Sequence, residues 1–379
     1  MSDEARVREQ RHEAMKPWSP KTAIELEREA LEDEEMPRIR VSRKAAALGV
    51  LFVVSVIAFF VVVLPQLAGL DDTIDRIRDG DPWWLAVAFV CTGLSFAGYV
   101  LQFHGVFSPG APRELRPSEA YQVTMAALAA TRLFAAAGAG GLALQAWAMR
   151  RSGMSRRMVA DRTITFLVLQ YWIYVAALVV FGLGLDAGIF SGSAPFAVTV
   201  LPAILGIVAM TIAGLLALTP TDLQRRLEHI TREGGRFARL AQRLANVPAA
   251  VSTGLRAAIA HMRHPDRTVG GAFAYWGFNI AVLWAAFHAF GESPPMAVLI
   301  MIYFVGMLGN LLPLPGGVGG VDGGMIGASI AFGVPSSLAI VAVLTYRAFA
   351  FWLPTLPGIV AYFQLRRTVA RWKAEAAAV

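Results

Sequence analysis

The sequence predicts an all-α integral membrane protein with six full spans and two re-entrant helical hairpins that form an inverted-topology repeat. Hydrophobic residues make up 56% of the 379 residues, charged residues make up only 16%, and the mean hydropathy is +0.53. Soluble globular proteins carry more charge than this. Several apolar runs reach the length of about 20 residues that a spanning helix needs. Two other apolar segments are interrupted by glycine or proline, which a straight spanning helix does not favour.

The chain begins with a polar segment, residues 1–44, in which acidic residues predominate up to residue 37, and we expect it to form a largely disordered cytoplasmic tail. Docking of a protein partner is an alternative role for this tail. Four basic residues between Arg38 and Lys44 stand directly before the first expected span, 45–64. Basic residues beside a span mark its cytoplasmic end, so the sequence places the tail inside.

Charge alternates between the loops that follow. Residues 71–82 contain five Asp and two Arg, so we expect an external loop, after which Trp83 and Trp84 mark the membrane interface. The same reasoning at the later loops places both termini in the cytoplasm of a cell membrane, with a short tail at 368–379. It also explains the net charge of +7 without nucleic acid. The spans after the first are 83–107, 163–185, 196–218, 269–290 and 337–363, within a transmembrane domain at 45–367.

One long loop, 220–268, contains nine Arg and only four acidic residues, which is typical of the cytoplasmic side. Leucine, isoleucine and phenylalanine recur in it at helical spacing, with arginine between them. We therefore expect a basic amphipathic helix pair that lies on the anionic inner leaflet. The alternative is a solvated loop that packs on the helix bundle.

The segment from Leu311 to Pro335 is apolar but contains a run of proline and glycine. Broken backbone at membrane depth is tolerated only where protein buries it or where it lines a wet cavity. We expect a re-entrant hairpin that descends from about Ala297 and returns to Phe332, and it enters from outside because its flanks lack basic residues. The alternative is a helix whose glycines pack closely on its neighbours. The expected turn residues are Pro313, Pro315, Gly316, Gly317, Gly319 and Gly320.

A second interrupted segment, Ser118 to Arg151, contains a glycine and alanine run at 135–141 and is flanked by basic residues at both ends. A single crossing would leave arginines outside, so we expect a hairpin that enters from the cytoplasm and leaves again. The two hairpins enter from opposite faces, and each leads through a short glycine-containing link into a span. This is the pattern of an inverted repeat whose broken helices meet near the midplane.

Few polar side chains fall within the apolar segments, where an unpaired polar group is costly. Arg347 stands near the middle of the last span, and Asp322 is its obvious partner. The pair either clamps the second hairpin to the last helix or forms a cationic site for a lipid phosphate that Asp322 tunes. The candidate substrate-binding residues are Arg132, Gln145, Asp161, Arg162, Asn310, Asp322 and Arg347.

Asp161 and Arg162 also have an ordinary structural interpretation. Asp161 at a helix start fits an N-cap, and Arg162 fits an anchor that reaches the interface. The chain contains no metal-ligand spacing, no phosphate-binding loop and no hydrolase triad. We therefore expect no metal, no cofactor and no catalytic residue.

The motif LLPLPGGVGGVDGGMIGA at 311–328, followed by LTYRAFAFWLP at 344–354, resembles the membrane region of lysylphosphatidylglycerol synthase, a flippase-like family of bacterial inner-membrane proteins. The segment 137–155 and the Asp161-Arg162 pair match that family's first motif more loosely. Asp161 and Asp322 stand where the family usually has Glu. The resemblance covers 45–367 and implies movement of aminoacylated phospholipid between leaflets. It does not imply synthase activity, because the soluble domain that charges the lipid is not in this sequence.

These observations favour a flippase or lipid-linked transporter that moves an anionic or aminoacylated phospholipid, and not an enzyme. One alternative is an intramembrane lipid-modifying transferase, for which Asp322 is a lone candidate base. Another is a non-catalytic subunit of a cell-envelope assembly complex that docks through the tail or through 220–268. The expected partners are membrane phospholipids or such an assembly protein, and no nucleic acid.

Overall fold

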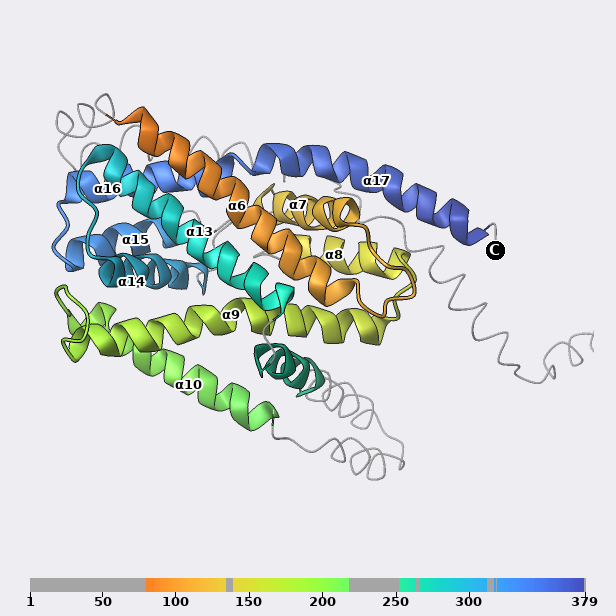
Figure 1. Ribbon diagram of the computed structural model, residues 1–379, viewed down its shortest axis with the longest axis horizontal. Coiled ribbons are helices and arrows are strands. Elements are labelled where there is room, and N and C mark those ends of the chain that lie inside the picture. Colours follow the sequence, from red (N-terminus) through yellow and green to blue (C-terminus); the bar gives the residue numbers. More distant parts are fainter. Residues whose placement is uncertain are drawn as a thin grey trace, which may run out of the picture. The chain divides into compact units, whose positions relative to one another are not determined.

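The computed structural model describes residues 80–133, 139–217, 252–263, 266–311, 317 and 319–377, and these residues are mostly helical (Figure 1). All of them belong to one unit, Val41–Val379. The tail 1–44, the expected span 45–64 and residues 220–251 of the basic loop lie outside the described residues.

Five helices in the described part of the chain are long and apolar enough to cross a membrane. They coincide with the expected spans after the first, so the all-α membrane class is confirmed. Their exposed faces are rich in leucine, isoleucine, valine and phenylalanine, which suits contact with lipid. The five are α6 (Pro82–Phe107), α9 (Arg156–Asp186), α10 (Val200–Ala217, after the short turn η2 at Phe196–Val198), α13 (Arg267–Phe290) and a last helix from Ser336 to Glu375.

The two interrupted segments form two pairs of short helices. The first pair is α7 (Pro117–Leu133) against α8 (Ala139–Arg151), and the second is α14 (Met296–Met307) against α15 (Gly320–Ala331). At 1.5 Å per residue these helices measure roughly 18–26 Å, less than the about 30 Å of a hydrocarbon core. Each pair therefore has the dimensions that a helical hairpin requires.

The second half of the described chain repeats the helix order of the first. Each half has a long helix, a short pair and another long helix: first α6, α7, α8 and α9, then α13, α14, α15 and the last helix. The long helices α6 and α13 run antiparallel and pack closely (Figure 1). They cross at Gly98 and Gly271, where a Cβ on either glycine would lie 2.8 or 2.6 Å from the other's carbonyl oxygen.

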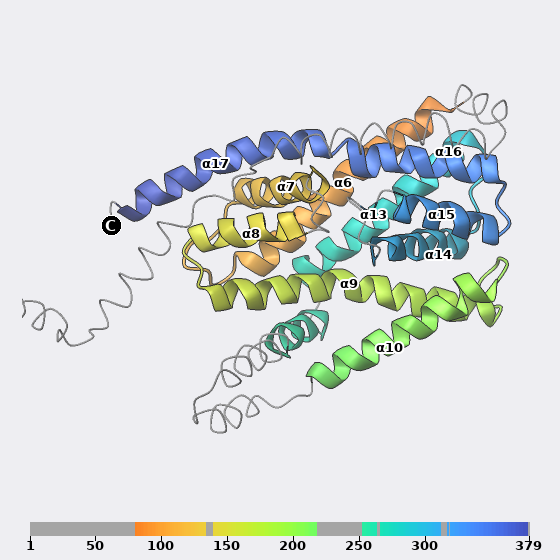
Figure 2. The same ribbon diagram turned by 180° about the vertical axis from the view of Figure 1, so that it is seen from behind.

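Each hairpin packs on a long helix of the other half. The helix α7 packs on α17 (Thr355–Ala377), the end of the last helix in the second half, and α14 packs on α9, which belongs to the first half (Figure 2). Each hairpin is therefore held by the final long helix of the other half. The two halves are therefore similar in helix order and in helix contacts, and not in residue identity.

The second hairpin combines a broken backbone with close glycine packing, so features of both sequence interpretations are present. A short 3-10 turn, η3 (Leu308–Leu311), continues α14 towards the turn. Gly317 and Gly319 have φ angles of 66° and 84°, which favour glycine, and Gly320 begins α15. The predicted turn residues Pro313, Pro315 and Gly316 lie outside the described residues.

Replacement of Gly309 by alanine is expected to destabilise this hairpin. A Cβ on Gly309 would lie 2.2 Å from the carbonyl carbon and oxygen of Gly320, and backbone atoms cannot step aside as a flexible side chain would. Overpacking of this kind costs about 1–3 kcal/mol. The control is Gly323→Ala, because a Cβ there would meet nothing within 4 Å. Thermal unfolding in detergent measures both, and equal melting temperatures would contradict the expectation.

The described end of the basic loop packs on the bundle. Residues 252–263 form a helix in which Leu255 is buried, and the Gly254 carbonyl accepts a hydrogen bond from Thr165 Oγ1 at 3.2 Å. Arg256 Nε donates to the last residue of α10, Ala217, at its carbonyl oxygen. This part of the loop therefore packs on the bundle, and the expected basic amphipathic helix pair of 220–268 stays a prediction.

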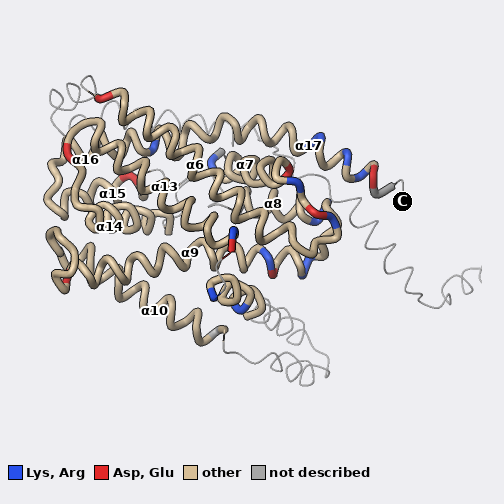
Figure 3. Tube along the Cα trace, in the orientation of Figure 1, with Lys and Arg blue, Asp and Glu red and all other residues tan. Residues whose placement is uncertain are grey.

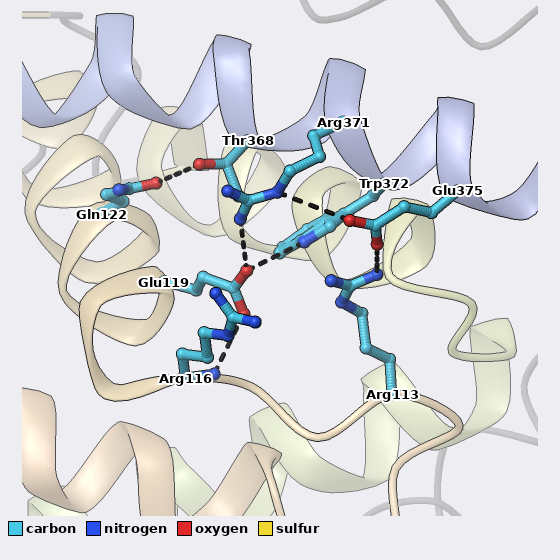
Figure 4. A network of polar contacts seen from close by, with 8 residues as sticks. All are labelled: Arg113, Arg116, Glu119, Gln122, Thr368, Arg371, Trp372 and Glu375. Atoms are coloured by element: carbon cyan, nitrogen blue, oxygen red, sulfur yellow. Dashed lines mark hydrogen bonds and ion pairs between the residues drawn. The ribbon is translucent and has the colours of Figure 1, made fainter.

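A polar network fastens α17 to the start of α7 (Figure 4). Glu119 is 1% exposed, and its Oε1 accepts hydrogen bonds from Arg371 Nη2 at 2.8 Å and Trp372 Nε1 at 3.1 Å. Its Oε2 accepts from the backbone N–H of Arg116. A buried carboxylate needs such partners, so this network fixes the first hairpin against the last helix. Two further contacts join the same region: Thr368 with Gln122, and Arg113 with Glu375.

Candidate functional site

The last long helix is broken near its middle. Between α16 (Ser336–Arg347) and α17 (Thr355–Ala377) lies a π-helical turn, η5 (Ala348–Trp352). Pro354 has no N–H to donate four residues back, so the carbonyl of Ala350 is left without its helical partner. Inserted π turns are frequent at functional sites, so this break is a candidate position for one.

Arg132, at the tip of the first hairpin, supplies the missing donors. Its Nη2 donates to the Ala350 carbonyl at 3.0 Å, and its Nη1 donates to the Phe351 carbonyl and to Thr355 Oγ1, the latter at 3.2 Å. A guanidinium presents several donors in a rigid fork, so one side chain satisfies several acceptors. The tip of the first hairpin therefore satisfies the backbone groups that the break in the last helix leaves free.

Asp322, at the tip of the second hairpin, reaches the same break. Its Oδ1 lies 2.5 Å from Arg347 Nε, and the two side chains are 6% and 8% exposed. Its Oδ2 accepts a hydrogen bond from the Gly319 N–H at 2.9 Å and so begins α15. The pair expected from the sequence is present, and Asp322 orders both its own helix and Arg347.

The two arginines share one aromatic ring. The guanidinium of Arg132 lies 4.7 Å from the centre of the Phe351 ring, and that of Arg347 lies 4.3 Å from it. Within the described residues, Asp322 is the carboxylate that pairs with this cluster, and it pairs with Arg347. Two cations and one carboxylate leave an excess positive charge in a buried place, held by carbonyl groups and aromatic faces. Such a place attracts an anion.

Buried tyrosines surround the cluster, and the sequence interpretation missed them. Tyr346 O–H lies 3.4 Å from Tyr303 O–H and 3.5 Å from Asn279 Oδ1, and Arg132 is within electrostatic range of Tyr275 and Tyr346. A phenolic hydroxyl at membrane depth needs a partner, so a tyrosine directly before Arg347 was a usable signal.

An apolar groove of about 690 Å³ runs along α6, α7 and the break. Its residues on α6 extend from Phe89 to His104, which is about 22 Å at 1.5 Å per residue. Phe96 lines this groove and also lies 5.7 Å, ring centre to guanidinium, from Arg132. The Phe96 ring therefore lies between the apolar groove and Arg132.

Asp161 and Arg162 lie away from the cluster. Arg162 donates to the carbonyls of Phe107 and Pro109 and so holds the end of α6. The N-cap interpretation of Asp161 is wrong, because Ser155 caps α9 and Asp161 falls in the second turn. The helix α9 begins at Arg156, seven residues before the expected span 163–185, because Arg156 and Arg157 were assigned to the cytoplasmic flank.

Two other predicted residues are also apart from the cluster. Gln145 is buried in α8, and its Nε2 has no hydrogen-bond partner among the described residues. Asn310 lies in η3 at the tip of the second hairpin, donates to Met307 Sδ at 3.4 Å and lines a separate cavity. The structure thus brings together Arg132, Asp322 and Arg347, but not the other predicted residues.

This fold and site define a class: a multi-pass, all-helical membrane protein whose two short helix pairs meet a broken helix at a buried, positively charged cluster. The family model described as "Lysylphosphatidylglycerol synthase TM region" matches residues 46–358, and the chain belongs to this family. The resemblance found in the sequence is therefore confirmed.

Similar curated proteins come from Methanothermobacter thermautotrophicus (strain Delta H) and are named UPF0104 membrane protein. One is 37% identical over 87 residues, 23% of this chain and 25% of that protein, and another is 36% identical over 86 residues, 22% and 26% of the two chains. The chain thus matches about a quarter of the length of these relatives. They are archaeal, so they do not support the restriction to bacteria that the resemblance implied.

Proposed function

We propose that this protein moves phospholipid between the two leaflets of a membrane, with the lipid phosphate received by Arg132 and Arg347. The observation that carries the proposal is the buried cluster in which two guanidinium groups share the Phe351 ring, while the one carboxylate of the cluster among the described residues pairs with Arg347 alone. An anionic or aminoacylated phospholipid supplies the missing negative charge as a phosphate, and a guanidinium fork suits phosphate oxygens.

The apolar groove supports a lipid and not a soluble anion as the ligand. Its lining is almost entirely apolar, it borders α6 over a length comparable to an acyl chain, and Phe96 connects it to Arg132. In this proposal the acyl chains remain in the groove or in the surrounding bilayer while the headgroup passes the cluster. The sequence contains no nucleotide-binding motif, so transport is passive, driven by the membrane potential or coupled to an ion.

We also propose the full topology of six spans, two re-entrant hairpins entering from opposite faces and both termini in the cytoplasm of a cell membrane. The short helix lengths and the exchanged hairpin contacts support the inverted repeat. Lys and Arg gather, together with several Asp and Glu, towards the end of the helices where α17 terminates, whereas the charged residues drawn at the opposite end are Asp and Glu (Figure 3). Alternating access would come from the two hairpins, whose tips meet at the break.

An enzymatic role has less support from this geometry. Asp322, the candidate base, has one oxygen against Arg347 and the other on the Gly319 N–H. Both oxygens of this carboxylate thus face groups of the protein itself, and neither is left free for a substrate proton. We therefore propose a transport protein whose partners are membrane phospholipids.

Blocking the groove tests this function. Gly93 lines the groove, and a Cβ there would meet nothing within 4 Å, so Gly93→Trp fills the groove without a clash at the backbone. We expect it to reduce movement of tail-labelled phosphatidylglycerol in proteoliposomes to the rate of protein-free vesicles. Gly214→Trp on α10 is the control, because its Cβ is equally free and lies outside the groove. Equal rates for both variants, or no movement with the wild type, would overturn the proposal.

A further inference from the structure

A second cavity, of about 350 Å³, lies where α6, α9 and α13 meet the tip of the second hairpin. Its wall is aromatic and is formed chiefly by Tyr99, Phe166, Tyr171, Tyr275 and Trp276. The rings are in contact with one another: Tyr99 and Tyr275 have centres 4.9 Å apart, and Tyr275 and Trp276 have centres 5.0 Å apart. Asn310 and its neighbours in η3 close the cavity on the side of the hairpin.

One buried polar atom in this cavity has no partner. Gln170 lines the cavity and is 5% exposed, and its Oε1 accepts no hydrogen bond from any described residue. Its backbone is fixed, because its carbonyl accepts a hydrogen bond from Trp276 Nε1 at 2.7 Å. A buried acceptor without a donor is costly, and its presence in a cavity indicates that a ligand supplies the donor.

We infer that this cavity binds a primary ammonium group. Faces of tyrosine, tryptophan and phenylalanine attract a cation through their ring quadrupoles, and a group of such faces is the common arrangement for an alkylammonium. The side-chain carbonyl oxygen of Gln170 adds a requirement that rings alone do not impose, because it needs an N–H or O–H donor. A primary ammonium offers both a positive charge and such a donor, whereas a quaternary ammonium lacks the donor and a neutral hydroxyl lacks the charge.

The inference rests on the proposed function and names the headgroup chemistry. Tyr275 lines the ammonium cavity, and its ring centre lies 6.3 Å from that of Phe96, which contacts Arg132. Tyr99 and Tyr275 are also within electrostatic range of Arg132. A zwitterionic headgroup could therefore place its phosphate towards Arg132 and its ammonium among the rings. Both ethanolamine and amino-acid esters carry such an ammonium group.

Binding in detergent tests the site independently of transport. Isothermal titration with dihexanoyl phosphatidylethanolamine is compared with the choline and glycerol analogues. We expect Gln170→Leu to weaken binding of the ethanolamine lipid by about tenfold, the loss of one hydrogen bond to a charged group, and to leave the choline lipid unaffected. Gln170→Glu should tighten it, because the acceptor becomes charged. Gln364→Leu, at an exposed position on α17, is the control.

The outcomes separate the two proposals. Tighter binding of the choline or glycerol lipid than of the ethanolamine lipid, or weaker ethanolamine binding in Gln170→Glu, would overturn the ammonium site. Ethanolamine binding that depends on Gln170, in a protein that moves no lipid in proteoliposomes, supports the site while the transport function fails. A short-chain alanyl-phosphatidylglycerol in the same titration shows whether the site prefers an amino-acid ester to ethanolamine.

Discussion

Replacement of Arg347 by glutamine is expected to lower the free energy of unfolding by about 3–5 kcal/mol. The change leaves the Asp322 carboxylate buried at 6% exposure without its cation, and an uncompensated buried charge is more costly than a lost attraction. It also removes the guanidinium from Phe351. Thermal or denaturant unfolding in detergent measures the loss, and a variant within about 1 kcal/mol of wild type would contradict the buried ion pair.

The double variant Asp322→Asn/Arg347→Gln separates a structural clamp from a lipid site. Two amides can hydrogen-bond with each other and leave no unpaired charge, so we expect most of the lost stability to return. The amide oxygen introduced by Asp322→Asn can still accept from the Gly319 N–H. If Arg347 receives the phosphate, this stable double variant moves phosphatidylglycerol at the rate of protein-free vesicles. A rate equal to wild type would mean that the pair is only a clamp.

Replacement of Arg132 by leucine is the second change with a large expected effect. It leaves the Ala350 carbonyl without its side-chain donor, at a cost of about 1–3 kcal/mol for an unsatisfied buried group, whereas the Phe351 carbonyl still accepts from Thr355 Oγ1 at 2.9 Å. Arg132→Lys retains the charge but not the fork, so it should recover only part of that stability. Lipid movement should be lost in Arg132→Leu and reduced in Arg132→Lys.

The matched control for this series is Arg263, an exposed arginine in the helix 252–263. Arg263→Leu and Arg263→Lys should both keep wild-type stability and wild-type lipid movement. If Arg132→Lys behaves like wild type in both measurements, the fork geometry is irrelevant and a point charge is enough. If Arg132→Leu is fully stable, the break in the last helix does not depend on the first hairpin.

The spans and the interrupted segments could be predicted because hydropathy and helix-breaking residues act locally. The Arg347–Asp322 pair could be predicted because an arginine at that depth requires a partner. The π turn could not, because its freed carbonyls are satisfied by Arg132, which is 218 residues from Ala350 in the sequence. The aromatic cavity was missed for a similar reason, since its rings come from three helices and each looks like ordinary apolar packing when read alone.

Asp161 and Arg162 are the opposite case, because local signals singled them out and the structure places them away from the cluster; their role in substrate binding stays a prediction. Their position beside a span and their match to a family motif made them candidates, yet Arg162 holds the end of α6. Polar residues near a helix end are commonly used to satisfy backbone groups, and the sequence contains no sign of which carbonyl they will meet. Local signals therefore identified polar residues correctly, but only the fold could say which of them share a site.

The network around Glu119 has a consequence for biosynthesis. Glu119 precedes its partner Arg371 by 252 residues, so a ribosome adding about 5–20 residues per second takes roughly 13–50 s to make the second after the first. During that interval the first hairpin has left the ribosome while its buried carboxylate still lacks an arginine. The first hairpin can therefore form its final contacts only after the C-terminal helix has been inserted. A nascent chain cut short before that helix would leave the Glu119 carboxylate without Arg371 and Trp372.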